Sequence, residues 1–399
     1  MRTVLVTGLG GAGRTTIAAA TALAAARGGR RTLLLSPDPG DVLGTPLART
    51  PKECAPGLWA ARIDAEVDFR AEFLALQDRG AALFDLLGAA RLAEEELTPL
   101  PGSEQFALLR AVARAAGGLT DGSAGGSYDV VVVDLPPLAQ SVPLLALPEQ
   151  LRRYLRRLLP PERQAARALR PVLAQLAGVP MPAEWLYETA ARWDRELSAV
   201  EALINDPGTA LRLVAEPGPA ANDALGAARP GLALHGLRVE TVVANRMLPA
   251  HSPDTWLAGL AAQQAKCLDE WHGAWGSGTE VHEVAHAGRE VRGLDDLALL
   301  DVPHVPEATD LPGALEADIE DRRDEDGILV WSIPLPGASK EGLGLVRRGD
   351  ELVLTVGPFR RIVPLPSALR RCTVSGAALA DGVLTLRFTP DPGLWPAGR

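Results

Sequence analysis

The sequence predicts an α/β fold, a doubly wound and mostly parallel sheet, followed by a small all-β antiparallel sandwich. A β-branched apolar run over residues 3–7 leads into a glycine loop and then into an alanine-rich helical segment, the opening of a β-loop-α unit. Continuous apolar runs follow at 32–36, 128–134 and 239–245, and such runs are typical of parallel strands that helices cover on both faces. From residue 327 onward, short strands alternate with turn residues, which predicts the sandwich.

The chain divides into two predicted domains joined by a linker. With 399 residues, it is longer than a single core usually grows before it splits. Residues 1–300 form the first domain, whose Leu-, Ala-, Arg- and Glu-rich stretches near 71–115 and 149–205 are predicted helical insertions. The acidic and proline-rich stretch over 301–326 is predicted to be a solvated linker, and residues 327–392 form the sandwich.

Composition argues against several classes of function. A formal net charge of −10 disfavours nucleic acid as a partner, because phosphate binding needs a basic face. No apolar run reaches the roughly 20 residues of a membrane helix, and the N-terminus lacks the features of a secretory signal, so we expect a cytoplasmic protein. The three cysteines lie far apart in the sequence, which gives no basis for a disulfide framework or a zinc site.

The glycine loop over residues 8–16, GLGGAGRTT, lies where backbone N–H groups and a helix N-terminus would face a phosphate. Its glycines satisfy the dinucleotide pattern G-x-G-x-x-G, and Asp38 follows the next strand, as that pattern requires. A P-loop instead needs a hydroxyl at the helix start and an aspartate after a later buried strand, and Thr15, Thr16 and Asp134 supply these. The hydroxyls favour the P-loop, and a dinucleotide-dependent oxidoreductase stays as the weaker alternative.

The loop resembles the deviant phosphate loop G-K-G-G-V-G-K-T-T of the ArsA-type ATPases, the family of the arsenite-pump ATPase and the tail-anchored-protein targeting ATPase. Further segments resemble the family in the same order: SPDPGDVLG at 36–44 its first switch, YDVVVVDLPPLAQSVPLLALPE at 128–149 its Walker B strand and second switch, VVANRMLP at 242–249 its adenine-contacting segment, and EVRG at 290–293 its closing motif. The resemblance implies a deviant-Walker P-loop NTPase that uses ATP and Mg²⁺.

The resemblance also implies roles for individual residues. The phosphates would be cradled by the loop residues Gly10, Gly11, Ala12, Gly13 and Arg14, with Thr15 and Thr16 completing the nucleotide-binding loop. Thr15 would ligate Mg²⁺, and Asp134 would hold the metal ion through water. Asn245 would read the adenine, and Asp38, the catalytic candidate, would stand at the position of the family's water-activating carboxylate. Phosphoryl transfer depends on positioning and charge neutralisation of this kind.

Two cationic points of the family's loop are changed in this chain. Leu9 occupies the position of the signature lysine that reaches across the dimer, and Arg14 occupies that of the second lysine. An arginine keeps the charge but is a broad planar fork rather than a compact ammonium. We therefore expect weak or absent ATP hydrolysis. The alternatives are an active ATPase that uses Arg14 and a non-enzymatic scaffold with a vestigial pocket.

The partners that the resemblance implies are a second subunit and a client. The chain would form a homodimer, or a heterodimer with an intact ArsA-type relative, and would act as a nucleotide-gated or regulatory subunit. The client would be a membrane protein, an ion channel or an arsenite-like ion. A methionine-lined client groove is not expected, because the chain has only three methionines. HEVAH at 282–286 formally matches a zinc-protease motif, but its surroundings alternate like a strand, whereas that motif needs a helix.

Residues 327–390 resemble the small heat-shock (α-crystallin) domain. LPGASKEGLGLVRRGDELVLTVG, RRIVPLPSAL and LADGVLTLRFTP match its segments in order and spacing. The resemblance implies an appended domain that binds a partner or shields apolar surface, with a purely structural cap as the alternative.

Overall fold

The computed structural model describes residues 1–38, 40–79, 92–98, 102–115, 127–159, 184–275, 278–311, 315 and 317–395. Its first part is an eight-stranded sheet in the order β3-β4-β2-β5-β1-β6-β7-β8. The strands are β1 (Arg2–Gly8), β2 (Thr32–Ser36), β3 (Lys52–Ala55), β4 (Leu58–Arg62), β5 (Val130–Pro137), β6 (Thr209–Ala215), β7 (Val239–Met247) and β8 (Glu280–Ala285). Neighbouring strands pair in parallel except β3, which runs antiparallel to β4. The predicted doubly wound, mostly parallel sheet is confirmed.

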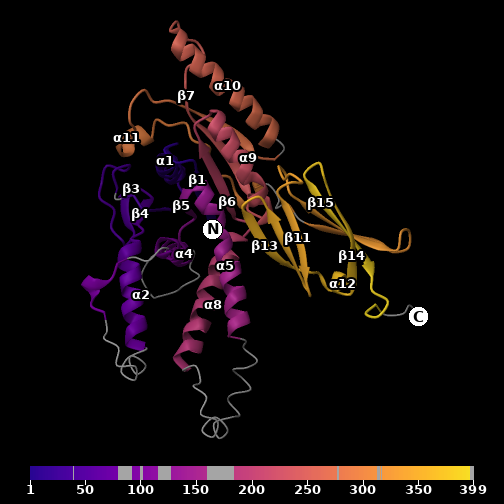
Figure 1. Cartoon of the computed structure of the whole chain (residues 1–399). Coiled ribbons are helices and arrows are strands. Elements are labelled where there is room, and N and C mark those ends of the chain that lie inside the picture. The colour runs from indigo at the N-terminus through magenta and orange to yellow at the C-terminus, as the bar shows by residue number, and fades with distance from the viewer. Residues whose placement is uncertain are drawn as a thin grey trace.

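Helices cover both faces of this sheet (Figure 1). One face carries α1 (Arg14–Arg27) and α11 (Gly293–Leu297). The other carries α4 (Ser103–Ala115), α5 (Leu138–Leu158), α8 (Glu184–Ile204), α9 (Pro219–Leu234) and α10 (Thr255–Trp275). In β1, Leu5 belongs to one apolar cluster, while Val4 and Val6 belong to the other. Because successive side chains of a strand point to opposite faces, a strand covered on both faces is apolar throughout.

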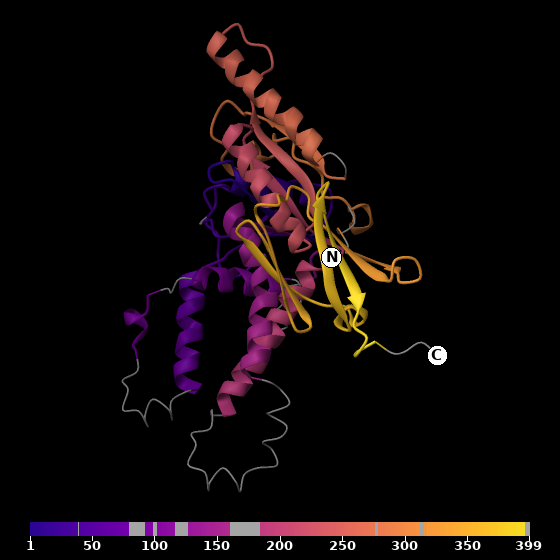
Figure 2. The same cartoon turned by 45° about the vertical axis from the view of Figure 1, so that its right-hand side comes forward.

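Three helices extend beyond the sheet. α2 (Ala65–Arg79), α5 and α8 run away from it, and α5 and α8 lie side by side in both views (Figures 1 and 2). Arg152 of α5 forms salt bridges with Asp194 at 2.9 Å and Glu201 at 2.6 Å, both on α8. Parts of the predicted helical insertions, residues 80–91 and 160–183, lie outside the described residues. Among the helices described, none combines the length and apolarity needed to cross a bilayer.

The central strand β6 does not read as an apolar run in the sequence, because Arg212 interrupts it. Arg212 is completely buried, and its guanidinium donates to Glu240 on β7, to the hydroxyl of Thr21 and to the carbonyl of Pro303, each at 2.9 Å. Arg2 of β1 also pairs with Glu240. A buried charge is tolerated only where it is paired and hydrogen-bonded, and these partners come from distant parts of the sequence. The sequence near β6 alone therefore does not show that Arg212 is buried in a strand.

The second part is a sandwich of two antiparallel sheets, with strand orders β14-β15-β10-β9 and β11-β12-β13, as predicted. Its elements are β9 (Asp318–Arg322), β10 (Ile328–Pro334), β11 (Leu343–Arg348), β12 (Glu351–Val356), β13 (Phe359–Pro364), α12 (Ser367–Arg370), β14 (Cys372–Ala380) and β15 (Val383–Pro390). Two short 3-10 helices, η1 (Glu94–Glu96) and η2 (Ala308–Asp310), lie outside it.

The structure differs from the predicted linker over 301–326. The strand β9 lies inside that stretch and pairs antiparallel with β10. Its charged residues suit an edge strand, which charges protect from pairing with other chains. At the start of the stretch, Val305 is buried and the carbonyl of Pro306 accepts a hydrogen bond from Arg2. The acidic run therefore contains structured edge residues as well as a connection.

The sandwich packs directly against α5 and α9. Arg153 of α5 makes two hydrogen bonds, of 3.0 and 2.6 Å, to the carboxylate of Glu351 on β12. Arg361 of β13 contacts Glu149 of α5 at 3.2 Å and donates to the carbonyl of Leu234 at 2.8 Å. One apolar cluster runs through both parts of the chain. The sandwich is therefore docked on the first part of the chain rather than tethered to it.

Candidate nucleotide site

The glycine loop connects β1 to α1 and leaves backbone donors free. Gly13 adopts the left-handed conformation, with φ of 86°, and its carbonyl accepts the first helical hydrogen bond, from Ile17 at 2.9 Å. Among the described residues, no acceptor partners the N–H groups of Gly10, Gly11, Gly13, Arg14, Thr15 and Thr16. Free N–H groups at a helix N-terminus, together with the helix dipole, form a site for an anion such as phosphate.

Hydroxyl and carboxylate oxygens that could bind a metal ion lie close together beside this loop. The hydroxyl of Thr15 donates to Asp134 Oδ2 at 2.8 Å, and the hydroxyl of Ser36, at the end of β2, donates to the same oxygen at 2.9 Å. Burial raises the pKa of the Asp134 carboxyl, while the bonds from Thr15 and Ser36 and the charge of Arg14 act in the opposite direction. Hydroxyl and carboxylate oxygens are the donors that Mg²⁺ prefers, so Thr15 and Asp134 fit this ion.

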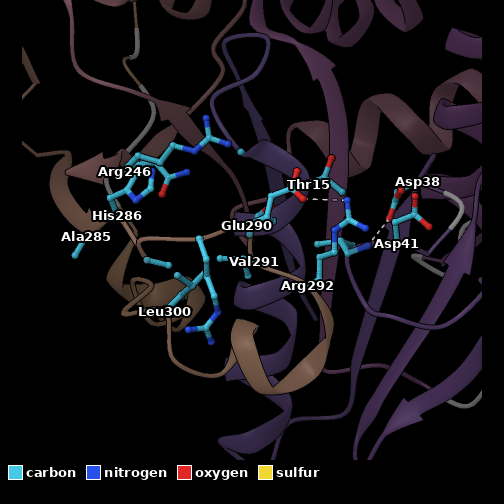
Figure 3. Close-up of a pocket in the computed structure, with 16 residues that line it drawn as sticks. Thr15, Asp38, Asp41, Arg246, Ala285, His286, Glu290, Val291, Arg292 and Leu300 are labelled. Atoms are coloured by element: carbon cyan, nitrogen blue, oxygen red, sulfur yellow. Dashed lines mark hydrogen bonds and ion pairs between the residues drawn. The ribbon is translucent and has the colours of Figure 1, made fainter. Parts of the chain in front are cut away.

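The C-terminal part of the loop, Gly13, Thr15 and Thr16, borders a cavity of about 510 Å³, and Asp134 lies behind Thr15, outside the lining. Asp38 and Asp41 lie at one end, Arg246 and His286 lie at the other, and the segment from Glu290 to Arg292 runs between them (Figure 3). Its lining also includes Gly13, Thr15, Thr16, Val42, Asn245, Ala285, Ala287, Arg289 and Leu300. The cavity has the size of a small-molecule site and combines free N–H donors with carboxylates and guanidinium groups.

Asp38, the catalytic candidate, is fixed by the segment after β2. Its backbone N–H donates to the hydroxyl of Ser36 at 3.0 Å, and its carboxylate accepts the N–H of Val42 at 3.2 Å. Because Ser36 also binds Asp134, a single serine joins the two aspartate positions of the site. Sequence reasoning missed Ser36, although it directly ends an apolar run and begins the quoted segment SPDPGDVLG.

Neither of the two altered loop positions lines the cavity. Leu9 is half-buried and packs against both apolar clusters of the sheet. The guanidinium of Arg14 donates to the carbonyl of Leu135 at the end of β5, and Arg14 does not line the cavity. Burial lowers the pKa of Arg14, and the nearby Asp134 opposes this effect. Leu9 thus offers no charge, and the Arg14 guanidinium is bonded to a backbone carbonyl beside Asp134.

The end of β7 holds the loop from outside. The side-chain amide of Asn245 donates to the carbonyl of Ala12 at 2.7 Å, and Arg246 donates to the carbonyl of Gly11 at 2.9 Å. Asn245 also lines the cavity, and its side-chain contact is with the loop; that it reads an adenine stays a prediction. Sequence reasoning missed Arg246; its place immediately after Asn245 is the only signal that marks it.

Of the HEVAH motif, residues 282–285 belong to β8 and His286 directly follows that strand, so the two histidines do not lie on a helix. His282 bonds to Glu280 at 3.2 Å and to the carbonyl of Asp301 at 2.9 Å, while His286 follows the strand at the cavity. In the described part of the chain, no three His, Cys, Asp or Glu side chains converge on a metal position. The zinc-protease interpretation is therefore set aside.

Comparison with known proteins gives matches to both parts of the chain. The profile of the anion-transporting ATPases matches residues 1–302, and that of the HSP20-like domain found in ArsA matches residues 326–388. An uncharacterised protein of Streptomyces coelicolor is 60% identical over 405 residues, which is 100% of both chains. A protein of Mycobacterium tuberculosis is 30% identical, covering 99% of this chain and 97% of its own. A protein of Aquifex aeolicus, provisionally named arsenical pump-driving ATPase 1, is 27% identical, covering 93% and 95% respectively.

Proposed function

The chain belongs to the anion-transporting ATPase family, and we propose that it binds Mg-ATP in this cavity and hydrolyses it weakly or not at all. It would act as a nucleotide-gated or regulatory subunit for a protein or ion client. The observation that carries this proposal is the combination of free loop N–H groups with the Thr15, Ser36 and Asp134 oxygens. These groups suit the binding of a phosphate chain and its magnesium ion.

Weak hydrolysis follows from the positions of the altered residues. Stabilising the charge that develops in phosphoryl transfer requires cations that face the transferred group. Leu9 is apolar and packed, and Arg14 is hydrogen-bonded to Leu135 at the end of β5. Asp38 would orient a water molecule at its end of the cavity. Without a loop cation that faces the transferred phosphate, the contribution of Asp38 to the rate is small.

An apolar groove supports a client with apolar surface. A cavity of about 400 Å³ lies among α2, α4 and α8 and is lined by the aromatic side chains of Phe69, Phe73, Phe106 and Trp193. Phe106 and Trp193 are 39% and 38% exposed, so part of each aromatic side chain faces solvent. The groove would offer a client aromatic side chains rather than methionines, of which the chain has only three. The second subunit would be another copy or an intact relative that contributes the missing lysine.

The test is a thermal-shift titration with Mg-ATP, Mg-ADP and NAD, followed by phosphate release from the same sample. We expect stabilisation by Mg-ATP and Mg-ADP but not by NAD, with phosphate release near background. A double variant, Leu9→Lys with Arg14→Lys, should restore the two cationic points and raise phosphate release about tenfold or more. Arg27→Lys at the far end of α1 is the matched control and should change nothing.

Each alternative predicts a different result. Rapid release by the unaltered protein would favour an active ATPase that uses Arg14, coupled to ion export or membrane-protein targeting. No shift with any nucleotide would favour the scaffold, unless adding an intact ArsA-type relative restored binding and so identified a heterodimer. A shift with NAD alone would revive the dinucleotide alternative.

A further inference from the structure

Arg246 has a backbone conformation that arginine rarely adopts. Its φ is 59°, in the left-handed region, and Asp381 at φ 50° is the other non-glycine residue with positive φ in the described ranges. Such strain persists only where the surroundings fix it, and it concentrates at functional positions. Two questions follow: which contacts hold Arg246 in this conformation, and what its side chain does there.

Gln264 of α10 holds the backbone at Arg246 in place. It is only 5% exposed, its amide donates to the carbonyl of Arg246 at 3.2 Å, and its carbonyl oxygen accepts the N–H of Leu248 at 2.8 Å. The N–H of His286 also donates to the carbonyl of Met247 at 2.9 Å. Backbone groups on both sides of the strained residue are thus held by a buried side chain and by the end of β8. The backbone at Arg246, from which its side chain starts, is therefore fixed by the fold.

The guanidinium of Arg246 acts on the phosphate loop. It donates to the carbonyl of Gly11, while Asn245 beside it donates to the carbonyl of Ala12. In a trans peptide the C=O and N–H groups point in opposite directions, so drawing these two carbonyls outward fixes the N–H groups of the same peptide units. One of these, the N–H of Ala12, donates to Leu9 within the loop at 3.3 Å, and the other, the N–H of Gly13, is free.

We propose that Arg246 is a positioning residue that holds the phosphate loop in its anion-binding shape, a task for which the loop's own side chains are unsuited. This inference rests on the proposed function of the cavity as a nucleotide site. Leu9 carries no charge, and the guanidinium of Arg14 is hydrogen-bonded to the carbonyl of Leu135. The hydrogen bond to the carbonyl of Gly11 therefore comes from Arg246 on β7. The ion pair of Arg246 with Glu216, at 3.5 Å and with both side chains about half exposed, is weak and leaves the guanidinium free to hold the loop.

The experiment compares Arg246→Asn with Asp381→Asn. Asparagine tolerates positive φ better than either residue, so both variants relieve backbone strain and should fold. Only Arg246→Asn removes the contact with the loop. Amide hydrogen exchange without nucleotide should become about tenfold faster in the loop of Arg246→Asn and stay unchanged in Asp381→Asn, because a lost hydrogen bond to a charged group opens the segment.

Binding supplies the second readout. The affinities for Mg-ATP and for inorganic tripolyphosphate should both fall about tenfold or more in Arg246→Asn, and Arg246→Lys should recover part of the loss. Unchanged exchange and unchanged affinities in Arg246→Asn would overturn the inference. If the unaltered protein bound neither ligand, the proposed function would fail instead, and the exchange comparison would still decide the role of Arg246.

Discussion

The metal-binding groups beside the phosphate loop and the two cationic positions of the loop differ in what they keep. The metal-binding groups, Thr15, Ser36 and Asp134, form a compact set of hydrogen-bonded oxygens. Of the two cationic positions, one is the apolar Leu9 and the other is Arg14, which is bound to a backbone carbonyl. Groups that hold a magnesium nucleotide are therefore separate from groups that accelerate its hydrolysis, and a chain can keep the first while it changes the second.

Asp134→Asn should have the largest effect on this comparison. Asparagine keeps the size of the side chain and can accept the Thr15 and Ser36 hydrogen bonds, but it removes the charge that would hold the water shell of Mg²⁺. The gain in ATP affinity on adding Mg²⁺ should fall about 10- to 100-fold, measured by titration with and without the metal ion. Asp129→Asn, at the exposed start of the same apolar run, is the control. If Asp134→Asn kept the full magnesium effect, Asp134 would have no role in metal binding.

Gly13→Ala tests whether loop shape, rather than side-chain charge, sustains binding. A Cβ at Gly13 would lie 2.5 Å from the amide nitrogen of Asn245 and would disturb its bond to Ala12. Gly29→Ala is the matched control, because Gly29 has nearly the same φ, 87° against 86°, and no atom within 4 Å of its added Cβ. Denaturant titration should show a loss of about 1 kcal/mol for Gly29→Ala and about 2 to 3 kcal/mol for Gly13→Ala, and only the latter should lose ATP affinity. Equal losses in the two variants would show that the contact with Asn245 is irrelevant.

Local patterns in the sequence predict most of the sheet and the loop. The glycines, the paired threonines and the aspartate that ends a buried run each depend on short segments with a direct physical meaning. Two residues singled out in this way, Thr15 and Asp134, lie within hydrogen-bond distance in the fold, at 2.8 Å. The antiparallel sandwich is predicted equally well, because the alternation of apolar and polar residues and the turn residues repeat over short distances in the sequence.

Features that depend on distant partners are not predicted. β6 contains a buried arginine whose partner, Glu240, lies on another strand. The charged β9 becomes a strand through its pairing with β10. In the site, Arg246 acquires a role only because the fold brings the end of β7 beside Gly11. In each case the determining contact joins segments that no window of sequence contains, so propensity and periodicity give no signal for it.

Ser36→Ala should have the smallest effect on ATP binding and tests whether Ser36 tunes the pKa of Asp134. Burial raises the pKa of Asp134 and the Ser36 hydrogen bond lowers it, so removing that bond should raise the pKa further. A protonated carboxyl cannot hold the water shell of Mg²⁺; hence the magnesium effect on ATP binding is lost as pH falls through this pKa. In Ser36→Ala the loss should begin at higher pH, by about one unit or less. Ser141→Ala is the control, because Ser141 bonds to Thr7 at 2.9 Å and to Pro136 at 2.7 Å rather than to Asp134. A shift to lower pH, or the same shift in both variants, would mean that Ser36 does not tune this carboxylate.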